Sequence, residues 1–575
     1  MRGTIPISVG QGARSLTRWD ALAVLLTLGL LVFLAEASRH LLQPLAELQV
    51  APVSLAPGNL PEYAVRTTLR MFVALAFSLI FTFTYATIAA KSRRAEVLLV
   101  PLLDILQSVP ILGFISVTVV FFMSLAPGRV LGAEFAAVFA IFTSQAWNMA
   151  FSFYQSLRTV PVELVEASRT FRLSGWMRFW RVEVPFAMPQ LIWNMMVSMS
   201  GSWFFVVASE AISVGNTTVT LPGIGSYIAL AIEQRNLGAV CWAIVAMLVV
   251  ILLYDQLLFR PLVAWADRFR FEQQVGVRPP KSWVLDVMRR SRAVAVLTEP
   301  LSRLWRLTFR WSLVGRRDIV AKPSGRRSRI VDWLWNGVVA ALALLALWRV
   351  GVFVSTNISP QGAGTALLLG LATLTRVIVL IALATVVWVP IGVMVGTRPR
   401  LAQFIQPVAQ FLAAFPANVL FPIAVSAIVV LSLNPNIWLS PLMILGTQWY
   451  ILFNVIAGAS AIPSEMRDVG TNLQVRGWLW WKKIALPAVF PYYVTGAITA
   501  SGGSWNASIV AEVASWGSTR LQASGLGAYI VDATTAGDFP RIVLGIAVMS
   551  FYVVIVNRLF WRPLYWYAER KFRLG

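Results

Sequence analysis

The sequence has very few of the residues from which metal sites and disulfide networks are built. Its 575 residues include one cysteine, Cys241, and one histidine, His40. A disulfide framework and a metal site made of Cys and His ligands are therefore excluded. Charged residues make up only 13% of the chain, whereas a soluble protein carries roughly a quarter.

The short motifs of nucleotide-binding and hydrolytic sites are absent too. The sequence contains no G-x-x-x-x-G-K-[ST] loop, no H-E-x-x-H, no C-x-x-C and no G-x-S-x-G. We therefore expect no catalytic residues, no metal and no ATP site of that kind in this chain.

Long apolar segments fill most of the chain instead. Hydrophobic residues make up 58% of it and the mean hydropathy is +0.71, which is typical of an integral membrane protein. A membrane-spanning helix needs about 20 mostly apolar residues. We predict an all-α polytopic fold with about 12 spans, at 20–38, 67–90, 97–123, 131–155, 186–212, 239–260, 332–354, 366–396, 403–433, 437–461, 488–513 and 541–561.

The basic residues lie mainly between these segments. The net charge is +23. When the spans alternate across a membrane from a cytoplasmic N-terminus, the loops rich in Lys and Arg all fall on one side, as the positive-inside rule requires. Both termini are then cytoplasmic in a bacterial inner membrane. This distribution argues against nucleic-acid binding.

The two halves of the chain match in the same order, at a shift of 302 to 306 residues. Arg70 pairs with Arg376, Glu210 pairs with Glu512, and the Gly-Ser-Trp at 201–203 recurs at 503–505. Each half has an even number of predicted spans, so the repeats share one orientation. We expect them to be related by a pseudo-twofold axis along the membrane normal, with the pathway between them.

This repeat sets the domain boundaries. The first six-span half is predicted at 1–272 with its core at 60–272, and the second at 331–575 with its core at 365–575. Residues 273–330 form a basic cytoplasmic linker, in which 301–314 predicts an amphipathic helix in the membrane interface. The linker is either a tether between fused halves or a docking segment.

A charged segment occurs once in each half on the predicted cytoplasmic side. The copies are VPVELVEASRTFRLSGWMRFWRVEVP (160–185) and IPSEMRDVGTNLQVRGWLWWKKIALP (462–487). In each copy a proline begins a short acidic helix, which breaks before a basic, aromatic helix. A membrane anchor explains the aromatic and basic residues but not the acidic helix. Two such helices on one face offer a pseudo-symmetric partner two docking sites.

The segment resembles the EAA loop of permease subunits of binding-protein-dependent ABC importers. In that family, E-A-A, three residues, a glycine and nine further residues precede I-x-L-P. The matching stretches are Glu166-Ala167-Ser168 and Asp468-Val469-Gly470. The fifth span, which carries Glu and Trp, and the following G-[IL]-G are similar to the nitrate/sulfonate/taurine-type branch. The resemblance covers about 60–272 and 365–575 and implies a type I importer fold.

The resemblance implies that each loop is a coupling helix. Its partners would be two ATP-binding cassette subunits, which hold ATP and Mg, and an extracytoplasmic substrate-binding protein that delivers a small solute; this chain would hold no cofactor. The implied contact residues are Glu163, Glu166, Ala167, Ser168, Arg172, Gly175, Glu465, Asp468, Val469, Gly470, Gln474 and Gly477.

The loops depart from the family pattern at one position. The family glycine lies thirteen residues before the proline, where this chain has Arg172 and Gln474. A glycine follows three residues later in both copies, as Gly175 and Gly477. Because the copies share the shift, we expect the two coupling helices to share one geometry.

Polar residues inside the predicted spans are candidates for the pathway. The candidates are Glu210, Glu512, Trp203, Trp505, Arg70, Arg376, Gln145 and Gln448. Two alternatives stay open: the glutamates could cap a re-entrant segment, and the amides could bond between helices. Arg70 and Arg376 could supply either the compensating charge or the contact with the solute.

The sequence thus predicts the permease of an ABC importer, possessing no enzymatic activity itself. A secondary transporter with six-plus-six parallel repeats is the alternative, since it shares this repeat but needs no ATPase. A membrane scaffold is a third, and it predicts no solute flux. The sequence does not identify the solute, and it is compatible with nitrate, sulfonates, bicarbonate-like anions and small heterocycles.

Overall fold

The computed structural model describes residues 53–108, 111–214, 217–269, 282–291, 299–300, 303, 307, 326–460, 462 and 464–572. The predicted span at 20–38 and most of the linker at 273–330, including the amphipathic helix, lie outside the described residues. The chain divides into two compact units. Unit 1 contains Pro161–Pro189 and the described part of Asp255–Asp318, and unit 2 contains the other described residues.

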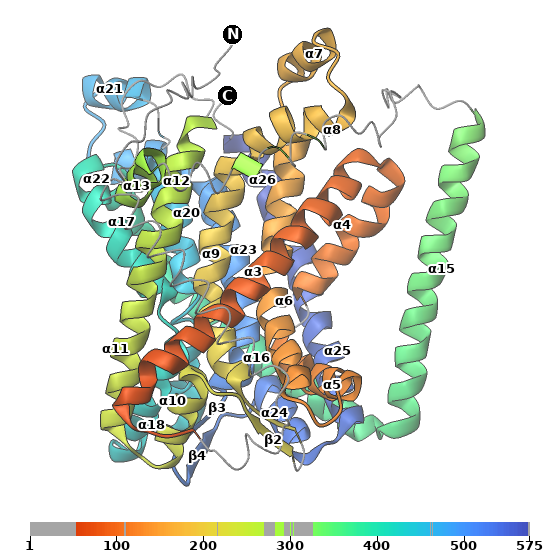
Figure 1. Cartoon of the computed structure of the whole chain (residues 1–575), viewed down its shortest axis with the longest axis vertical. Coiled ribbons are helices and arrows are strands. Elements are labelled where there is room, and N and C mark those ends of the chain that lie inside the picture. The colour runs from red at the N-terminus through yellow and green to blue at the C-terminus, as the bar shows by residue number, and fades with distance from the viewer. Residues whose placement is uncertain are drawn as a thin grey trace. The chain divides into compact units, whose positions relative to one another are not determined.

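Unit 2 holds most of the first half. Its elements there are η1 (Pro57–Asn59), α3 (Leu60–Lys91), α4 (Arg93–Ser108), α5 (Ile111–Leu125), α6 (Val130–Arg158), most of α9 (Val184–Glu210), β1 (Ala211–Val214), β2 (Thr217–Thr220), α10 (Ile224–Glu233) and α11 (Leu237–Tyr254). Helices α3 and α6 pack along each other (Figure 1).

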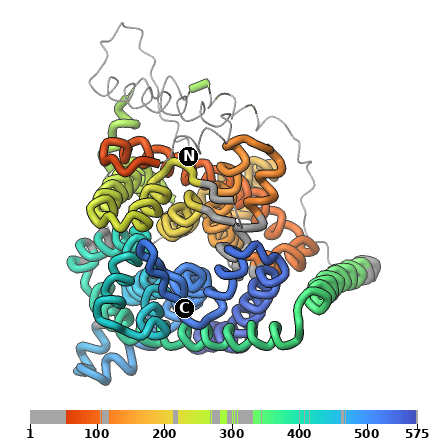
Figure 2. Tube along the Cα trace, turned by 90° about the horizontal axis from the view of Figure 1, so that it is seen from below, coloured from red at the N-terminus to blue at the C-terminus, as the bar shows by residue number. Residues whose placement is uncertain are grey.

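Unit 2 also holds the described second half. Its elements are α15 (Arg326–Asn357), α16 (Pro360–Gly396), α17 (Pro399–Ala414), η5 (Ala417–Leu420), α18 (Phe421–Val430), α19 (Pro435–Trp438), η6 (Ser440–Met443), α20 (Gln448–Ser460), α21 (Ser464–Asn472), α22 (Gly477–Trp480), η7 (Trp481–Ala485), α23 (Leu486–Ala511), β3 (Val513–Trp516), β4 (Thr519–Gln522), α24 (Leu526–Ala536), α25 (Phe539–Val556), η8 (Asn557–Trp561) and α26 (Arg562–Phe572). Within this unit the two halves lie side by side (Figure 2).

Unit 1 contains the first charged segment and the end of the first half. Its elements are α7 (Val162–Thr170), α8 (Gly175–Arg178), η2 (Phe179–Glu183), the first turns of α9, η3 (Asp255–Phe259), α12 (Arg260–Ala266), η4 (Asp267–Phe269) and α13 (Trp283–Arg290).

Eight helices in the described residues are long and apolar enough to cross a membrane. They are Pro57–Lys91, Val130–Arg158, Gly175–Glu210, Leu237–Ala266, Val331–Asn357, Pro360–Gly396, Gly477–Ala511 and Phe539–Ala568. Each overlaps a predicted span. The predicted span at 437–461 corresponds to the pair Pro435–Met443 and Gln448–Ser460, which is bent by 44° and would make a ninth.

The predicted spans at 97–123 and 403–433 were wrong as single helices. The first region forms α4 and α5, and the second forms α17 and α18 with η5 between them. In the second region Phe415 precedes Pro416 and has extended backbone angles, φ −72° and ψ 126°. A residue before proline is pushed out of the helical region by the proline ring, so the chain breaks there.

Two short antiparallel hairpins add to the helices, which the prediction of an all-α fold missed. In the first, Ala211 pairs with Thr220 and Val214 with Thr217. In the second, Val513 pairs with Gln522 and Trp516 with Thr519. Strands this short, four residues each, have too little alternation to stand out beside 26-residue apolar helices.

Small residues let the central helices approach closely, as in other membrane proteins. Helices α16, α20 and α23 pack on one another. A Cβ added at Gly396 would lie 2.6 Å from the carbonyl oxygen of Ile456. Large apolar side chains point outward instead: Leu368 and Val386 of α16 are 70% and 73% exposed. An outer surface of this kind is suited to lipid.

Candidate functional site

Glu210 lies at the centre of a buried cluster in the first half. Its Oε1 accepts hydrogen bonds from Arg70 Nη1 and Thr67 Oγ1, both at 2.7 Å. Its Oε2 accepts from the backbone N–H of Gly225 at 2.7 Å, and the N–H of Ile224 donates to Thr67 Oγ1 at 3.0 Å. The carboxylate and the threonine thus satisfy the first turn of α10, where the helix dipole favours negative charge.

The second half builds a similar cluster, in which Thr373, Arg376 and Glu512 correspond to Thr67, Arg70 and Glu210. Glu512 Oε1 accepts from Thr373 Oγ1 at 2.7 Å and from Arg376 Nη1 at 2.9 Å. Its Oε2 accepts from the N–H of Ala528 at 3.2 Å, and the N–H of Leu526 donates to Thr373 Oγ1 at 2.9 Å. Glu512 therefore caps α24 as Glu210 caps α10.

The hairpins and glycines explain why the glutamates reach these helix ends. In each half the glutamate carbonyl accepts an N–H from beyond the hairpin, Leu221 to Glu210 at 2.9 Å and Ala523 to Glu512 at 2.8 Å. The chain then turns so tightly that a Cβ added at the next glycine, Gly223 in the first copy, would overlap the carboxylate. The capping alternative is thus the geometry found at both glutamates.

The two clusters differ in one residue that sequence reasoning missed. In the first, Glu134 of α6 forms a bidentate pair with Arg70, with Nε to Oε2 and Nη2 to Oε1 both at 2.6 Å. In the second, Asn436 accepts from Arg376 Nη2 at 3.4 Å and from the N–H of Ser524 at 2.8 Å. The repeat alignment places Glu134 opposite Asn436, so a search for unmatched charges could have found it.

Both predicted tryptophans lie in the core. Trp203 is fully buried and stacks on Tyr254 with ring centroids 6.0 Å apart. Trp505 is 2% exposed and stacks on Tyr552 at 6.3 Å. Each ring therefore fixes the fifth span of its half against the sixth.

The two predicted glutamines bond between helices. Gln145 is buried, and its Oε1 accepts from Ser78 Oγ at 3.3 Å. Gln448 Oε1 accepts from Trp388 Nε1 at 3.0 Å. This is the interhelical bonding that was left open as the alternative to a place in the pathway.

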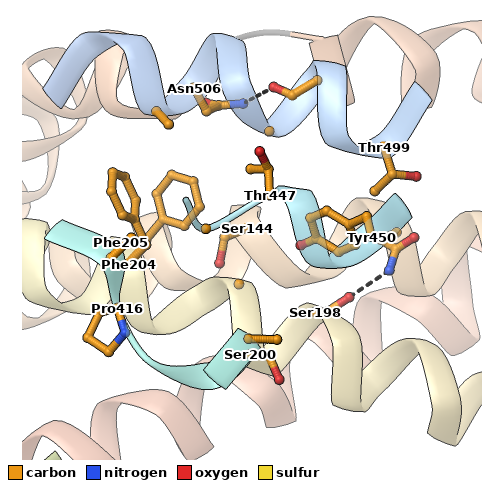
Figure 3. Close-up of a pocket in the computed structure, with 18 of the residues that line it drawn as sticks. Ser144, Ser198, Ser200, Phe204, Phe205, Pro416, Thr447, Tyr450, Thr499 and Asn506 are labelled. Carbon is orange, nitrogen blue, oxygen red and sulfur yellow. Dashed lines mark hydrogen bonds between the residues drawn. The ribbon is translucent and has the colours of Figure 1, made fainter. Parts of the chain in front are cut away.

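A cavity of about 160 Å³ lies between the two halves within unit 2 (Figure 3). Side chains from α6, α9, α20 and α23 line it, together with Ala413, Phe415, Pro416 and Ala417. Among its described lining residues, none is one of the eight predicted pathway residues. The fifth span of each half lines it with small and polar residues, which are Ser198, Ser200 and Gly201 in the first half and Thr499, Gly502, Gly503 and Asn506 in the second. In a sequence, such groups of small and hydroxyl residues indicate a close or polar interface between helices.

In the charged segment of unit 1, the acidic helix α7 ends next to a residue with a left-handed backbone conformation. Arg172 has φ +49°. The N–H of Leu173 donates to the carbonyl of Ser168 at 3.0 Å, which closes α7 in the manner of a Schellman motif. Glu163, Glu166 and Ala167 are exposed, whereas Ser168 is buried.

The charged segment in unit 2 ends its acidic helix in the same way. Gln474 has φ +52°, and the N–H of Val475 donates to the carbonyl of Gly470 at 2.8 Å. Glu465, Asp468 and Val469 are exposed and Gly470 is buried.

The position of the family glycine is thus a left-handed position in both copies, occupied here by Arg172 and Gln474. This conformation is rare for residues other than glycine. The later glycines differ between the copies: Gly175 begins α8 and Gly477 begins α22, but of the two only Gly477 has a positive φ, +58°.

Comparisons with known proteins agree with this duplicated arrangement. The family model described as "Binding-protein-dependent transport system inner membrane component" matches residues 59–260 and again 388–566. The chain is 32% identical over 190 residues to the bicarbonate transport system permease protein CmpB of Synechocystis sp., covering 33% of this chain and 63% of that protein.

Two further relatives carry other names. The nitrate import permease protein NrtB of Leptolyngbya laminosa is 27% identical over 188 residues, 33% of this chain and 64% of that protein. The glycine betaine/proline betaine transport system permease protein ProW of Escherichia coli is 25% identical over 194 residues, 34% and 51%. The chain thus spans less than two thirds of the length of these relatives.

The two matches of the family model together cover more than half of the chain, and the helices are apolar and long enough for a membrane. The protein is therefore a multi-pass membrane protein that belongs to the family of inner-membrane permease components of binding-protein-dependent transport systems.

Proposed function

We propose that this chain forms the whole membrane-spanning part of an ATP-driven ABC importer. Its halves, 1–272 and 331–575, would be parallel six-span repeats about a pseudo-twofold axis, joined by the cytoplasmic linker 273–330, with both termini in the cytoplasm. The duplicated family match and the duplicated glutamate clusters support this arrangement. Two partner subunits would bind and hydrolyse ATP, and an extracytoplasmic binding protein would deliver the solute.

The observation that carries the proposal is the acidic loop that each half presents after a proline. Glu163 and Glu166 in one loop, and Glu465 and Asp468 in the other, are exposed. Acidic side chains gain nothing from anionic lipid headgroups, which attract Lys and Arg instead. An exposed acidic helix beside a membrane is therefore better suited to a protein partner, which we take to be an ATP-binding subunit.

The rest of each loop supports the same role. The left-handed Arg172 and Gln474 close both acidic helices with equivalent hydrogen bonds, so that each helix is a preformed unit. A preformed docking helix loses less conformational entropy on binding. We propose that these two helices transmit nucleotide-driven closure to the spans.

The predicted pathway residues take a framework role in this proposal. Arg70 with Glu210, and Arg376 with Glu512, would hold α10 and α24 against the second spans. Trp203, Trp505, Gln145 and Gln448 would hold the fifth, sixth and fourth spans in place. The solute would instead pass through the cavity between the halves. Relatives named for bicarbonate and nitrate support a place in the nitrate/sulfonate/taurine-type branch.

Reversing the acidic charge of both loops tests the coupling role. We expect Glu166→Lys with Asp468→Lys to abolish ATP-dependent uptake and to reduce co-purification of the ATP-binding subunits by at least tenfold, since each lost charged contact is worth roughly 1.5–3 kcal/mol. Uptake is measured in reconstituted vesicles, and subunit recovery is measured by pull-down.

The control is Glu233→Lys, the same charge reversal at an exposed glutamate at the end of α10. It should leave uptake and subunit recovery at the level of the unmodified protein. Normal uptake by the double variant would refute the coupling assignment. Uptake that persists without any ATP-binding subunit would indicate a secondary transporter, and a lack of flux in the fully assembled complex would indicate a scaffold.

A further inference from the structure

The cavity between the halves has no charged lining. Its described walls are built from hydroxyl, amide, aromatic, aliphatic and glycine residues, without an Asp, Glu, Lys or Arg. The cationic groups Arg70 and Arg376 are already bound to glutamates at the ends of α10 and α24.

An uncharged wall is a poor site for an anion. An isolated carboxylate-like charge pays a large desolvation penalty in a low-dielectric cavity unless a cation or several free donors face it. Most donors here are already engaged. Ser144 bonds to Ser202 at 2.7 Å, and Asn148 Nδ2 donates to Ser198 Oγ at 2.9 Å. Thr447 and Ser504 bond to each other at 3.0 Å.

The Tyr450 hydroxyl is the polar group best placed to meet a solute. It makes no hydrogen bond to any described residue, and it lies over Gly201, where an added Cβ would be 2.8 Å from the hydroxyl oxygen. Glycine at 201 therefore lets the one phenol of the described lining approach the backbone of α9 closely. A hydroxyl can donate or accept one bond, which matches a carbonyl or amide edge rather than a full charge.

Aromatic rings form much of the remaining wall. Trp147 comes from α6, Phe204 and Phe205 from α9, Phe415 from the end of α17, and Tyr450 from α20. Figure 3 shows Tyr450 and the two phenylalanines around one space, with hydroxyl side chains of both halves between them. Aromatic faces bind planar groups by offset stacking or edge-to-face contact.

We infer that the cavity is a binding site for a small, uncharged, planar solute, such as a heterocycle with an amide edge, that bonds to Tyr450 and lies against the aromatic rings. This inference rests on the proposed function as a permease, and it gives the solute a different class from the anions for which CmpB and NrtB are named. A charged solute would lose its water of hydration in this cavity, and no charged side chain in the described wall would compensate for that loss.

Equilibrium dialysis on the full chain in lipid nanodiscs tests the inference. The probes are uracil and nicotinamide as uncharged planar amides, nitrate and bicarbonate as anions, and glycine betaine as a zwitterion, at equal ionic strength. We expect saturable binding of at least one planar amide and no saturable binding of the anions or the betaine. Because no ATP-binding subunit is needed, the Glu166→Lys, Asp468→Lys variant should bind the probe normally, which separates this result from the coupling test.

Two variants locate the site. Tyr450→Phe removes one hydroxyl and should weaken binding roughly 2- to 12-fold, the range for one hydrogen bond, whereas Tyr492→Phe, at a ring that is 39% exposed, should change nothing. Gly201→Ala should abolish binding, because its methyl group would displace the Tyr450 hydroxyl from its present position. Saturable binding of nitrate, bicarbonate or betaine that Gly201→Ala abolishes overturns the inference. Failure of both planar amides to bind, or binding that is unaffected by both cavity variants, overturns it as well.

Discussion

The two glutamate clusters share a plan but differ in their charge balance. In the first half Arg70 lies between two carboxylates, Glu210 and Glu134. In the second half, within the described part of the chain, Arg376 forms its ion pair with Glu512 alone. The first cluster therefore carries one more negative than positive charge, and the second is balanced.

This difference shows which part of the cluster the fold needs. The threonine, the arginine and the glutamate that bind the helix end are present in both halves, together with the hairpin and the glycines. The second carboxylate, Glu134, is present in one half only, so it is not needed to close the helix. It changes instead how much the stability of each cluster depends on the capping glutamate, because Glu134 gives Arg70 another carboxylate partner.

Removing the arginines should give the largest effects and should separate the clusters clearly. Arg70→Ala leaves two carboxylates without their shared cation, the fully buried Glu210 and the partly buried Glu134, whereas Arg376→Ala leaves one. Breaking a buried pair by deleting one partner destabilises by about 3–5 kcal/mol, and we expect Arg70→Ala at the top of this range and Arg376→Ala at the bottom. Thermal unfolding in detergent measures both.

The control for the arginines is Arg541→Ala, where the guanidinium is 63% exposed and pairs with Asp538 on the surface. Such pairs contribute at most about 1 kcal/mol. Equal losses for Arg70→Ala and Arg376→Ala would show that Glu134 adds nothing to the first cluster.

Neutralising the capping glutamates should destabilise the protein more in the second half than in the first, which is the reverse of the order expected for the arginines. Glu210→Gln leaves Arg70 in its bidentate pair with Glu134, so we expect a loss of about 1 kcal/mol. Glu512→Gln leaves Arg376 without a carboxylate in the described part of the chain, so we expect about 3 kcal/mol. Glutamine keeps the side-chain volume and an acceptor oxygen, which isolates the charge. An unfolding midpoint that falls further for Glu210→Gln would contradict this.

Adding the missing charge to the second cluster should have the smallest effect. Asn436→Asp keeps the acceptor for the Ser524 N–H and places a carboxylate against Arg376, which should stabilise the protein by up to about 1 kcal/mol. It should also recover part of the loss in Glu512→Gln. The matched control is Asn434→Asp, because Asn434 caps α19 by its side chain and its replacement keeps that cap. A rescue by both substitutions would point to net charge rather than to the pair with Arg376.

Much of the helical framework could be predicted because it follows from local composition. Apolar runs long enough for a bilayer produced eight helices that match predicted spans. The repeat singled out Arg70, Arg376, Glu210 and Glu512, and pairing of the arginines with the glutamates was one of two roles left open for them. The broken helices were missed because a hydropathy window averages over a proline such as Pro416. The hairpins were missed because four-residue strands carry little pattern of their own.

The site was harder to predict than the framework. Buried charge marked Arg70 and Glu210 as important, but the sequence could not say whether that charge faces a solute or a helix end. Their role depends on the N–H of Gly225, which lies fifteen residues beyond Glu210 and reaches its carboxylate only through the hairpin. The cavity was not predicted because its described lining is uncharged. Uncharged side chains lack the large desolvation penalty that makes a charged residue in an apolar segment stand out.

The sequence by itself determined that this is a membrane protein with a duplicated permease pattern, because hydropathy, charge distribution and internal repeats are properties of the chain read in order. Only the tertiary structure decided that the glutamates cap helices, that Glu134 makes the two clusters unequal, and that Tyr450 packs against Gly201 in the wall of a cavity whose described lining is uncharged. These are contacts between residues far apart in the chain. Their energies depend on distance and burial, which packing alone fixes.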